Sequence, residues 1–542
     1  MSKFREFLKK SVENIINHGD TDIFPFPVEN LLFFDKKTEF IDILENVHKN
    51  FESYIVDYPV LHERSLQAVG YYGFRYGTQI DPLWNAYLLA LVLSIADDIE
   101  NARIKTDRKC VFSYRYEYNK DKHSLFNKEY NWSEFNKQAV ELAKNNSVIL
   151  KCDISNFYPS VYHHRIENAL RKATNNSEAV RRILILLSKI SKGVSYGLPV
   201  GGPAARILSE LLLNRVDRLL LSEGISFCRY ADDYIISANS TESAYAKLIF
   251  LCEKLHENEG LAIQKSKTQI LTSKEFLSLS EFNELDEKED ADQQEINFLR
   301  LRLFYDPYSD SADEDYEKLK HELIKFDIIG MLSKEISKSR INQALTKRLI
   351  NAVKFLDPQQ KKAAVLSIFQ SKEEDKSNLD ILYPVFPSIV ILCKAIIKDL
   401  DSDTRTIIFT TLRDLIKNES YITKVPVNLA YAVRILALDK SEETDFVLGQ
   451  VYKSEDNPII LSDIILAMAQ RDCDFWISDK LKSYSALSRW EKRSLFLSSY
   501  ILGDEGHHWR EKFKDELPEI DKLLISWFSS RHQQNSGWGE IL

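Results

Sequence analysis

The chain has 542 residues, of which 44% are hydrophobic and 28% charged, with only 16 glycines and 14 prolines. That balance is ordinary for globular protein, and the length predicts roughly two to four domains rather than one core. The formal net charge of -9 at pH 7 excludes a protein that coats nucleic acid through its overall field, so any nucleic-acid contact must come from a local basic patch.

Cysteine usage and hydropathy indicate the compartment. The six cysteines are scattered and form no CxxC pair, which argues against a structural zinc site and a disulfide framework and is typical of a reducing compartment. No apolar run predicts a bilayer-spanning helix, and the first residues, MSKFREFLKKSVENII, lack the apolar core of a secretion signal. We therefore expect an intracellular protein without membrane contact.

The first clear element along the chain is a helix over residues 81–99. Asp81 is a candidate cap, Pro82 occupies the first helical position, and apolar residues recur at helical spacing. The triplet Ala-Asp-Asp at residues 96–98 lies in this helix, where it turns from its apolar face to its solvated one. A basic, aromatic stretch follows, and its alternation predicts a strand over residues 111–118.

The next elements place a second Ala-Asp-Asp triplet in a different setting. NSVILKCDIS predicts a short strand that ends in Asp153, and a Gly/Pro loop then opens a long helix at Pro203. ISFCRYADDYIISAN predicts a hairpin with Asp232 and Asp233 at its tip. An amphipathic helix over residues 243–260 and a strand over residues 261–271 follow.

Composition changes near residue 278. Residues 278–295 are acidic and lack an apolar pattern, which predicts a loop or linker. From residue 311 onward helical runs alternate with short polar breaks, which favours an irregular array of helical hairpins, with a non-repeating bundle as the alternative. We expect a helical N-terminal extension over residues 1–60, an α+β domain over 61–310 and an all-α domain over 311–542.

The hairpin tip is a costly place for two carboxylates. Like charges a few ångströms apart in a partly buried turn repel, and Asp-Gly or Asn-Gly would serve a plain hairpin better. Asp153, from a neighbouring strand, would complete a site for hard divalent cations, because Mg²⁺ prefers carboxylate, water and phosphate oxygens. Two such ions roughly 4 Å apart can activate an attacking hydroxyl and stabilise a leaving pyrophosphate.

Four segments, in this order, resemble the motifs of a reverse transcriptase: DISNFY the first, GLPVGGPAARILSELLLN the second, YADD the third and GLAIQKSKT the fourth. The resemblance covers residues 60–275 or thereabouts. It implies a fingers and palm fold, a nucleotidyltransferase that makes DNA from dNTPs, and two Mg²⁺ ions for which Mn²⁺ can substitute.

The resemblance also assigns roles by motif position. It implies catalytic and metal-binding roles for Asp153, Asp232 and Asp233, with the backbone carbonyl of Ile154 as a further metal ligand. Tyr158 matches the aromatic gate that excludes a ribose 2′-OH, which favours deoxynucleotides.

Further nucleotide contacts follow from the same comparison of motifs. Lys267 is placed at the leaving pyrophosphate, Arg115 at the incoming triphosphate, and Pro199 and Gly201 in the nucleotide-binding loop. The basic stretch from Arg103 to Arg115 precedes a polymerase-like palm, which favours a nucleic-acid groove over a solvated face.

The second motif departs from the usual pattern, and the departure suggests a subgroup. Val200 replaces the glutamine that commonly helps to hold template and nucleotide, and an apolar residue cannot make those hydrogen bonds. Together with HGDTDIFPFPVEN, FSYRY and the long helical second half, this segment resembles the bacterial abortive-infection reverse transcriptases, the AbiK-like group of phage-defence polymerases.

That resemblance implies template-independent synthesis primed by a protein hydroxyl, so that DNA stays covalently attached to the enzyme. It also implies a HEAT-like helical array, homo-oligomers, an unidentified phage trigger and a cytoplasmic, bacterial location. Tyr54 and Tyr58 are two of many candidate priming residues. Two alternatives stay open: a templated, retron-like RNA-directed DNA polymerase, and a phage-sensing scaffold with an inactive palm.

Overall fold

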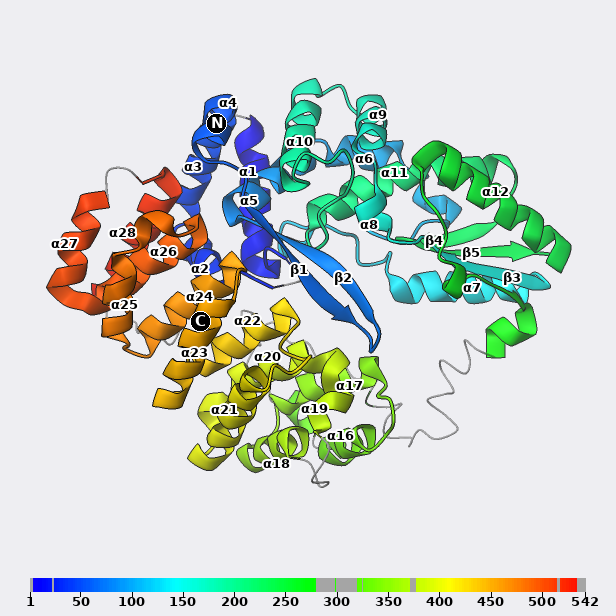
Figure 1. Cartoon of the computed structure of the whole chain (residues 1–542). Coiled ribbons are helices and arrows are strands. Elements are labelled where there is room, and N and C mark those ends of the chain that lie inside the picture. The colour runs from blue at the N-terminus through cyan, green and yellow to red at the C-terminus, as the bar shows by residue number, and fades with distance from the viewer. Residues whose placement is uncertain are drawn as a thin grey trace. The chain divides into compact units, whose positions relative to one another are not determined.

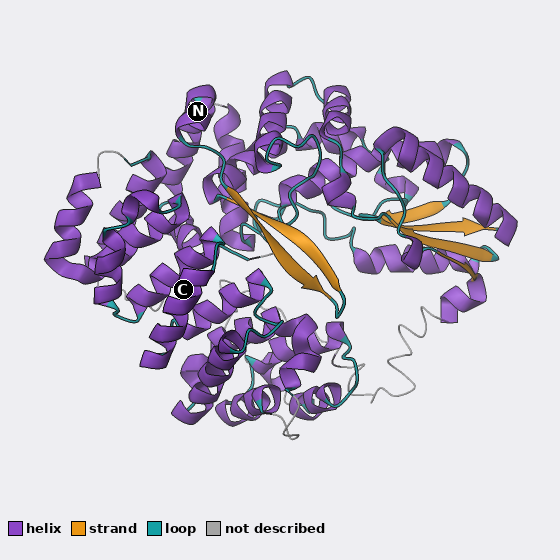
Figure 2. Ribbon diagram, viewed as in Figure 1, coloured by secondary structure: helices purple, strands orange, loops and turns teal. Residues whose placement is uncertain are grey.

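The structure is a computed structural model that describes residues 3–21, 24–278, 298, 319–323, 325–370, 377–513 and 517–533. Over these residues, strands form one four-stranded sheet and one two-stranded hairpin, and the remaining regular structure is helical (Figure 2). The chain divides into two compact units, Met1–Arg64 with Gly77–Asp286 and Ser65–Tyr76 with Glu287–Leu542. From residue 279 onward, the predicted acidic segment lies outside the described residues.

The first unit begins with amphipathic helices whose apolar faces pack on a buried one. Leu8, Val12 and Ile15 lie one helical turn apart on α1 and are buried. They face α5 (Pro82–Leu93), which is buried along almost its whole length. The N-terminal helices and the hairpin strands are α1 (Lys3–His18), α2 (Pro27–Asp35), α3 (Lys37–Lys49), α4 (Phe51–Asp57), β1 (His62–Val69) and β2 (Gly73–Ile80).

The predicted helix over residues 81–99 exists but is broken. The carboxylate of Asp81 accepts a hydrogen bond from the amide of Leu83 and caps α5 (Pro82–Leu93). The chain then bends by 49° into α6 (Ala96–Ala102). Asp97 and Asp98 lie in the first turn of α6 and are exposed, as expected for acids near the positive end of a helix.

The predicted strand over residues 111–118 is wrong. These residues make only isolated bridges, between Val111 and Arg229 and between Tyr116 and Phe126. Tyr114 has a φ of 46°, which breaks the extended conformation. The alternation arises because Phe112 points into the apolar core while Ser113 and its neighbours contact buried ions.

The central sheet has the strand order β4-β5-β3-β6, and its paired strands are antiparallel. Its strands are β3 (Val148–Asp153), β4 (Phe227–Tyr230), β5 (Asp233–Ala238) and β6 (Gln269–Thr272). The register pairs Asp153 with Asp233 and Tyr230 with Asp233, so residues 231 and 232 alone form the turn of the hairpin. The strands predicted on either side of the acids are therefore confirmed.

Helices cover both faces of this sheet (Figure 1). Ile149, Cys228 and Ile235 pack against α7 (Trp132–Lys144) on one face, and Val148 and Ala238 pack against α12 on the other. The helices that follow β3 in this unit are α8 (Phe157–Ser160), α9 (His163–Ala173), α10 (Ser177–Ile190), α11 (Pro203–Ser222) and α12 (Thr241–Glu259).

The long helix predicted after the Gly/Pro loop is confirmed as α11. Pro203 occupies its first turn, where a missing amide hydrogen costs nothing. Gly224 lies just past its end with a φ of 67°, a conformation that glycine adopts without a Cβ clash. The helix packs against α5, α6, α9 and α12.

The second unit is helical apart from its part of the hairpin, over the residues that the structure describes. Contacts link α17 to α20, α20 to α22, α22 to α24, α24 to α26 and α26 to α28, while a second row links α16, α18, α21 and α23. These helices are α16 (Ile328–Ile336), α17 (Gln343–Val353), α18 (Pro358–Phe369), α19 (Asn378–Leu382), α20 (Phe386–Ile396), α21 (Ser402–Lys417), α22 (Pro426–Leu436), α23 (Glu442–Ser454), α24 (Pro458–Gln470), α25 (Asp474–Leu481), α26 (Arg489–Ser498), α27 (Gly503–Phe513) and α28 (Glu519–Gln533).

Buried arginine–aspartate pairs recur between helices of the first row. Arg434 Nε on α22 lies 2.8 Å from Asp463 Oδ2 on α24, and Arg493 Nε on α26 lies 2.7 Å from Asp521 Oδ1 on α28. All four side chains are at most 9% exposed. The same kind of ion pair joins α22 to α24 and α26 to α28. This recurrence indicates a repeating arrangement of helices that the apolar pattern of the sequence does not display.

One stretch of this unit has the length and composition of a bilayer-spanning helix, contrary to the expectation from the sequence. Residues Asn378–Asp399 have a mean hydropathy of 1.8, and 61% of the window is buried inside the protein. Core helices of water-soluble proteins share these properties, so the stretch is weak evidence for a membrane segment.

Candidate active site

Three carboxylates converge where the central sheet ends. Asp153 is the last residue of β3, Asp232 lies in the hairpin turn and Asp233 opens β5. One oxygen from each of the three lies within 4.8 Å of the others. Asp153 is buried and the other two are half-buried, so the cluster has access to solvent from one side.

Backbone hydrogen bonds hold these acids in place. The amide of Ile154 donates to the carbonyl of Asp232 at 3.1 Å, which ties the end of β3 to the hairpin turn. The amide of Gln264 donates to the carbonyl of Asp153 at 2.7 Å, which adds the segment before β6. Because three segments distant in sequence are cross-linked through main-chain atoms, the backbone from which the carboxylates extend is fixed.

The electrostatics of the cluster favour a bound cation. Burial, followed by the charge of Asp153, raises the pKa of Asp232 to about 7. The same two causes raise the pKa of Asp233. An all-oxygen donor set of mutually repelling carboxylates fits hard divalent ions such as Mg²⁺ or Mn²⁺.

Lys267 reaches the cluster from the turn before β6. Its Nζ donates to Asp153 Oδ2 at 2.5 Å, and this hydrogen bond is the main cause of its raised pKa. The Lys267 side chain remains 64% exposed. The ammonium group is therefore at the carboxylates and also open to an incoming ligand, as its predicted role at a pyrophosphate requires.

Tyr158 is joined to the Gly/Pro loop and to α11. Its carbonyl accepts a hydrogen bond from the amide of Leu198 at 2.8 Å, and its hydroxyl accepts one from Ser209 Oγ at 3.5 Å. Burial raises its pKa, so the phenol stays neutral. Tyr158 thus lies between the loop and α11, five residues from Asp153 in the sequence, and its function as a sugar gate stays a prediction.

The loop before α11 has a well-defined backbone. Pro199 is buried, and Gly201 has a φ of 129°, which a residue with a Cβ rarely adopts. The carbonyl of Val200 accepts a hydrogen bond from the amide of Thr78 at 3.1 Å. These bonds shape the loop, while nucleotide contacts by Pro199 and Gly201 stay predictions.

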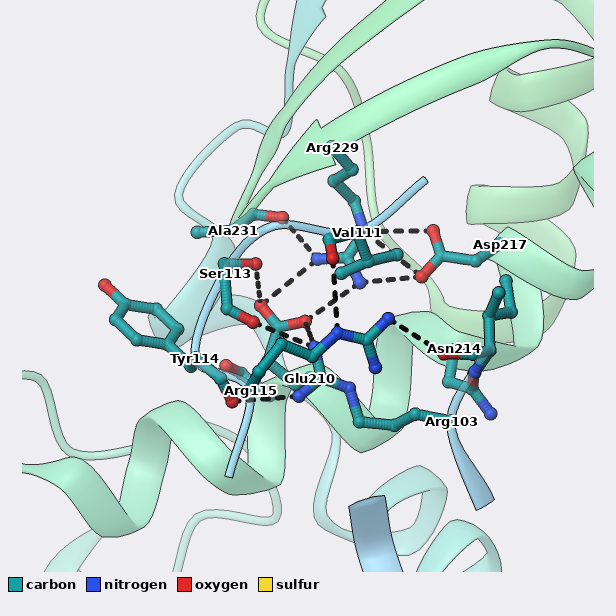
Figure 3. Close-up of polar contacts among 12 residues, drawn as sticks. Arg103, Val111, Ser113, Tyr114, Arg115, Glu210, Asn214, Asp217, Arg229 and Ala231 are labelled. Carbon is teal, nitrogen blue, oxygen red and sulfur yellow. Dashed lines mark hydrogen bonds and ion pairs between the residues drawn. The ribbon is translucent and has the colours of Figure 1, made fainter. Parts of the chain in front are cut away.

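A buried ion cluster lies beneath the hairpin (Figure 3). Arg229 on β4 donates to both carboxylate oxygens of Asp217 and of Glu210, at 2.6–3.2 Å. Arg103 Nη2 donates to Glu210 Oε2 at 2.7 Å, and Ser113 Oγ donates to Glu210 Oε1 at 2.5 Å. These five side chains are at most 3% exposed, so two arginines neutralise two acids out of contact with water.

The cluster also fixes the backbone of the turn. Arg229 Nη1 donates to the carbonyl of Ala231 at 2.8 Å, and Ala231 has a φ of 51°. Residues other than glycine, asparagine and aspartate seldom adopt that conformation, because the Cβ crowds the backbone. The buried guanidinium therefore stabilises an unfavourable turn directly before Asp232.

Comparisons with known proteins bear on this geometry. Residues 96–303 match the family model described as "Reverse transcriptase (RNA-dependent DNA polymerase)". The chain contains a reverse transcriptase domain. The match includes β3, the hairpin, α11 and β6, and hence all three acids.

Curated relatives of this domain come from retrons. The retron Mx65 reverse transcriptase of Myxococcus xanthus is 25% identical over 140 residues, which cover 23% of this chain and 33% of that protein. The retron Ec86 reverse transcriptase of Escherichia coli is 30% identical over 126 residues, which cover 22% of this chain and 38% of that protein. The chain thus spans little more than a third of the length of these relatives.

Among solved structures, a telomerase from Candida albicans in complex with a fragment of telomeric RNA aligns with 70% of this chain and 69% of its own. The TM-score is 0.31 and the sequence identity 9%, values too low to establish a shared fold over that span.

The structure gives no support to the triphosphate contact of Arg115 in the reverse transcriptase domain, which stays a prediction. Its side chain is 3% exposed, and its guanidinium donates to Glu100 Oε1 at 2.9 Å and to the carbonyls of Val111 and Ile104. Three of its five N–H groups have internal partners, and burial keeps the other two away from solvent. Arg103 is equally buried, so neither arginine lines the predicted nucleic-acid groove.

The other Ala-Asp-Asp triplet forms no comparable cluster. Asp97 and Asp98 are exposed, and Asp98 accepts a hydrogen bond from Thr174 Oγ1 at 2.5 Å. Among the described residues, the three acids of the reverse transcriptase hairpin and β3 are the only such group of candidate ligands.

Of the two candidate priming tyrosines, Tyr54 lies on α4 and Tyr58 directly follows it. Tyr58 is 1% exposed, and its hydroxyl donates to Asp81 Oδ2 at 3.3 Å. A phenol engaged in this way is poorly placed to attack a nucleotide. Tyr54 is half-buried, and a priming role for either residue stays a prediction.

Sequence reasoning missed Glu210, Asp217 and Arg229. The two acids are seven residues apart on α11, which puts them on one face of a helix otherwise rich in buried leucine. Two acids at that spacing on an apolar helix face predict that a buried basic side chain from another element pairs with them. Arg229, inside an apolar strand directly before the acidic turn, is the matching signal.

Proposed function

We propose that the reverse transcriptase domain synthesises DNA from dNTPs, with Asp153, Asp232 and Asp233 as its catalytic acids. The observation that carries this proposal is the convergence of three carboxylate oxygens within 4.8 Å at the end of the sheet. Two Mg²⁺ ions, for which Mn²⁺ can substitute, would be held by these acids and by the carbonyl of Ile154. When bound, such ions supply activation of a hydroxyl and neutralisation of the leaving pyrophosphate.

The chain's own residues then position the reactants. Lys267, in contact with Asp153 and largely exposed, offers an ammonium group to the departing pyrophosphate. Tyr158 presents its ring to the sugar and disfavours a 2′-OH by contact. Pro199 and Gly201 set the conformation of the loop whose backbone lies against the nucleotide.

We further propose that synthesis needs no template and starts from a hydroxyl of the protein itself, as in the AbiK-like group. Val200 supports this proposal, because an apolar side chain in place of glutamine removes hydrogen bonds to template and nucleotide. In this proposal the second unit is a HEAT-like array, and the alternating helix contacts and repeated Arg–Asp pairs support it. The protein would act as a cytoplasmic, bacterial homo-oligomer in antiphage defence, in response to a phage trigger.

The deciding experiment uses the purified full chain with labelled dNTPs and Mg²⁺ and no template. Labelled DNA that stays with the protein after denaturation and is lost on nuclease digestion supports protein-primed synthesis. Asp232→Asn is the inactive control. Absence of label on the wild-type protein, in a preparation that extends an added primer on a template, contradicts the template-independent proposal and leaves DNA synthesis intact.

A templated, retron-like enzyme is the second candidate, and the two retron relatives favour it. Sequencing of the product decides between the two. Complementarity to a co-purified RNA supports the templated enzyme, whereas sequence unrelated to any bound RNA supports untemplated addition. A third candidate, a phage sensor with an inactive palm, requires that Asp232→Asn keep full phage resistance.

A further inference from the structure

A cavity of about 660 Å³ lies in the first unit, apart from the three acids. It is bounded by α9, by α11 and by the last residue of α12. Since α11 turns once per 3.6 residues, the cavity face with Arg215 and Arg218 is roughly a third of a turn from the face with Glu210 and Asp217. None of the residues assigned to DNA synthesis lines it.

Four basic side chains surround this cavity: Arg165, Lys172, Arg215 and Arg218. Arg218 donates to the carbonyl of Ala102 at 2.8 Å and Arg165 to that of Glu257 at 3.3 Å, bonds that use only part of each guanidinium. In the described part of the chain, Arg215 and Lys172 have no hydrogen-bond or ion-pair partner. Four cations gathered on a chain of net charge -9 make a local field that attracts anions.

Glu259 is a buried acceptor that also lines the cavity. It is 3% exposed, and no hydrogen bond or ion pair to its carboxylate is present among the described residues. Burial raises its pKa to about 7, against the charges of Arg215 and Arg165. Because it lines the cavity, this carboxylate is available to accept a hydrogen bond from a ligand there.

The remaining lining is mostly small or aliphatic, including Ala169, Leu211 and Leu219. The cavity volume lies within the range of small-ligand sites. The site therefore combines cations for an anionic group, an apolar wall for a flat ring and one buried acceptor for an N–H donor. A nucleoside phosphate whose base carries an exocyclic amine has all three features.

We propose that this cavity binds a nucleoside polyphosphate at a second site, distinct from the dNTP site at the carboxylates. The phosphates contact the basic residues, the base packs on the aliphatic wall, and its exocyclic amine donates to Glu259. Binding here uses arginine and lysine rather than a metal, whereas nucleotide at the acids depends on divalent ions.

Equilibrium dialysis of the full chain with labelled ATP in excess EDTA tests the site. We expect saturable binding by the wild type and by Asp232→Asn, and a loss of at least about tenfold in affinity in the double variant Lys172→Gln/Arg215→Gln, because two charge-assisted bonds are removed. Arg171→Gln is the matched control, since this α9 arginine pairs with Glu167 and does not line the cavity. Both substituted residues are exposed, so folding is expected to be preserved.

Unlabelled competitors test the ligand class. ATP should displace the label at least about tenfold better than tripolyphosphate, and Glu259→Leu, which removes the acceptor, should reduce this preference for ATP. Three results would each overturn the proposal: no saturable binding in EDTA, equal affinity for tripolyphosphate and ATP, or undiminished binding by the double variant. DNA synthesis by the three acids is measured separately with Mg²⁺, and neither result depends on the other.

Discussion

Arg229 donates a hydrogen bond from Nη1 to the carbonyl of Ala231 at 2.8 Å, and Ala231 holds the left-handed turn that presents Asp232. The same guanidinium is bonded to Glu210 and Asp217 on α11. One buried side chain therefore links the long helix to the backbone of the acidic turn. Burial opposes ionisation of Glu210, but the charges of Arg229 and Arg103 outweigh it and lower the pKa of that carboxyl.

Replacement of Arg229 by methionine should destabilise the first unit strongly. Two buried carboxylates would lose their main partner, and removal of one member of a buried ion pair costs about 3–5 kcal/mol. Urea titration followed by circular dichroism measures the change. In the matched control Arg181→Met, which breaks partly exposed pairs with Glu178 and Glu52, the expected loss is under about 1 kcal/mol. Equal effects of the two substitutions would contradict the role given to Arg229.

Asp232→Asn should lower the rate of dNTP incorporation by at least about 10³-fold. The substitution weakens a metal site that stabilises the transition state by several kcal/mol. The same substitution should remove the rise in melting temperature that excess Mg²⁺ gives the wild type. Asp97→Asn in the other Ala-Asp-Asp triplet is the control, and it should keep both properties. A Mg²⁺-dependent melting temperature in Asp232→Asn would place the ion elsewhere.

Tyr158→Val should admit ribonucleotides. A smaller side chain leaves space for the 2′-OH, and we expect the dNTP-to-rNTP ratio of kcat/KM to fall by about tenfold or more. Tyr158→Phe keeps the ring and loses only a long 3.5 Å hydrogen bond from Ser209. Its nucleotide ratio should stay within about twofold of the wild type. Unchanged discrimination in the valine variant would show that another residue is the gate.

Lys267→Gln should lower kcat with little effect on KM. The ammonium group contacts Asp153 and is exposed to the leaving group, and loss of a positioned proton donor costs about 10²–10⁴-fold in rate. Lys265→Gln removes a lysine two residues away in the same turn and should have little effect. A loss that appears mainly in KM would instead assign Lys267 to substrate binding.

Asp463→Ala should destabilise the second unit by about 3–5 kcal/mol, because it leaves the buried guanidinium of Arg434 without its carboxylate. Urea titration of the full chain, with its unfolding transitions separated, measures this loss. Asp479→Ala removes an ion pair with Lys482 in which the two side chains are 70–77% exposed, and it should change stability by less than about 1 kcal/mol. A small effect at Asp463 would argue against a periodic array held by these pairs.

Much of the first unit could be predicted from local pattern. The strand that ends in Asp153, the hairpin around Asp232 and the helix after Pro203 all carry signals within a few residues of themselves, such as apolar runs, turn residues and a proline at a helix start. The strand predicted over residues 111–118 failed because side-chain alternation there reflects an apolar core on one side and a buried ion cluster on the other.

Sequence by itself determined the order and chemistry of the segments that carry the acids, because each segment is a short-range pattern with few alternatives. Only the tertiary structure decided which charges are structural. Arg115 and Arg103 are basic residues in a basic stretch, and nothing local distinguishes a phosphate contact from a buried partner. Their partners, and those of Arg229, depend on packing among α6, α11 and β4, because a charge is tolerated in the interior only where an opposite charge from another element meets it.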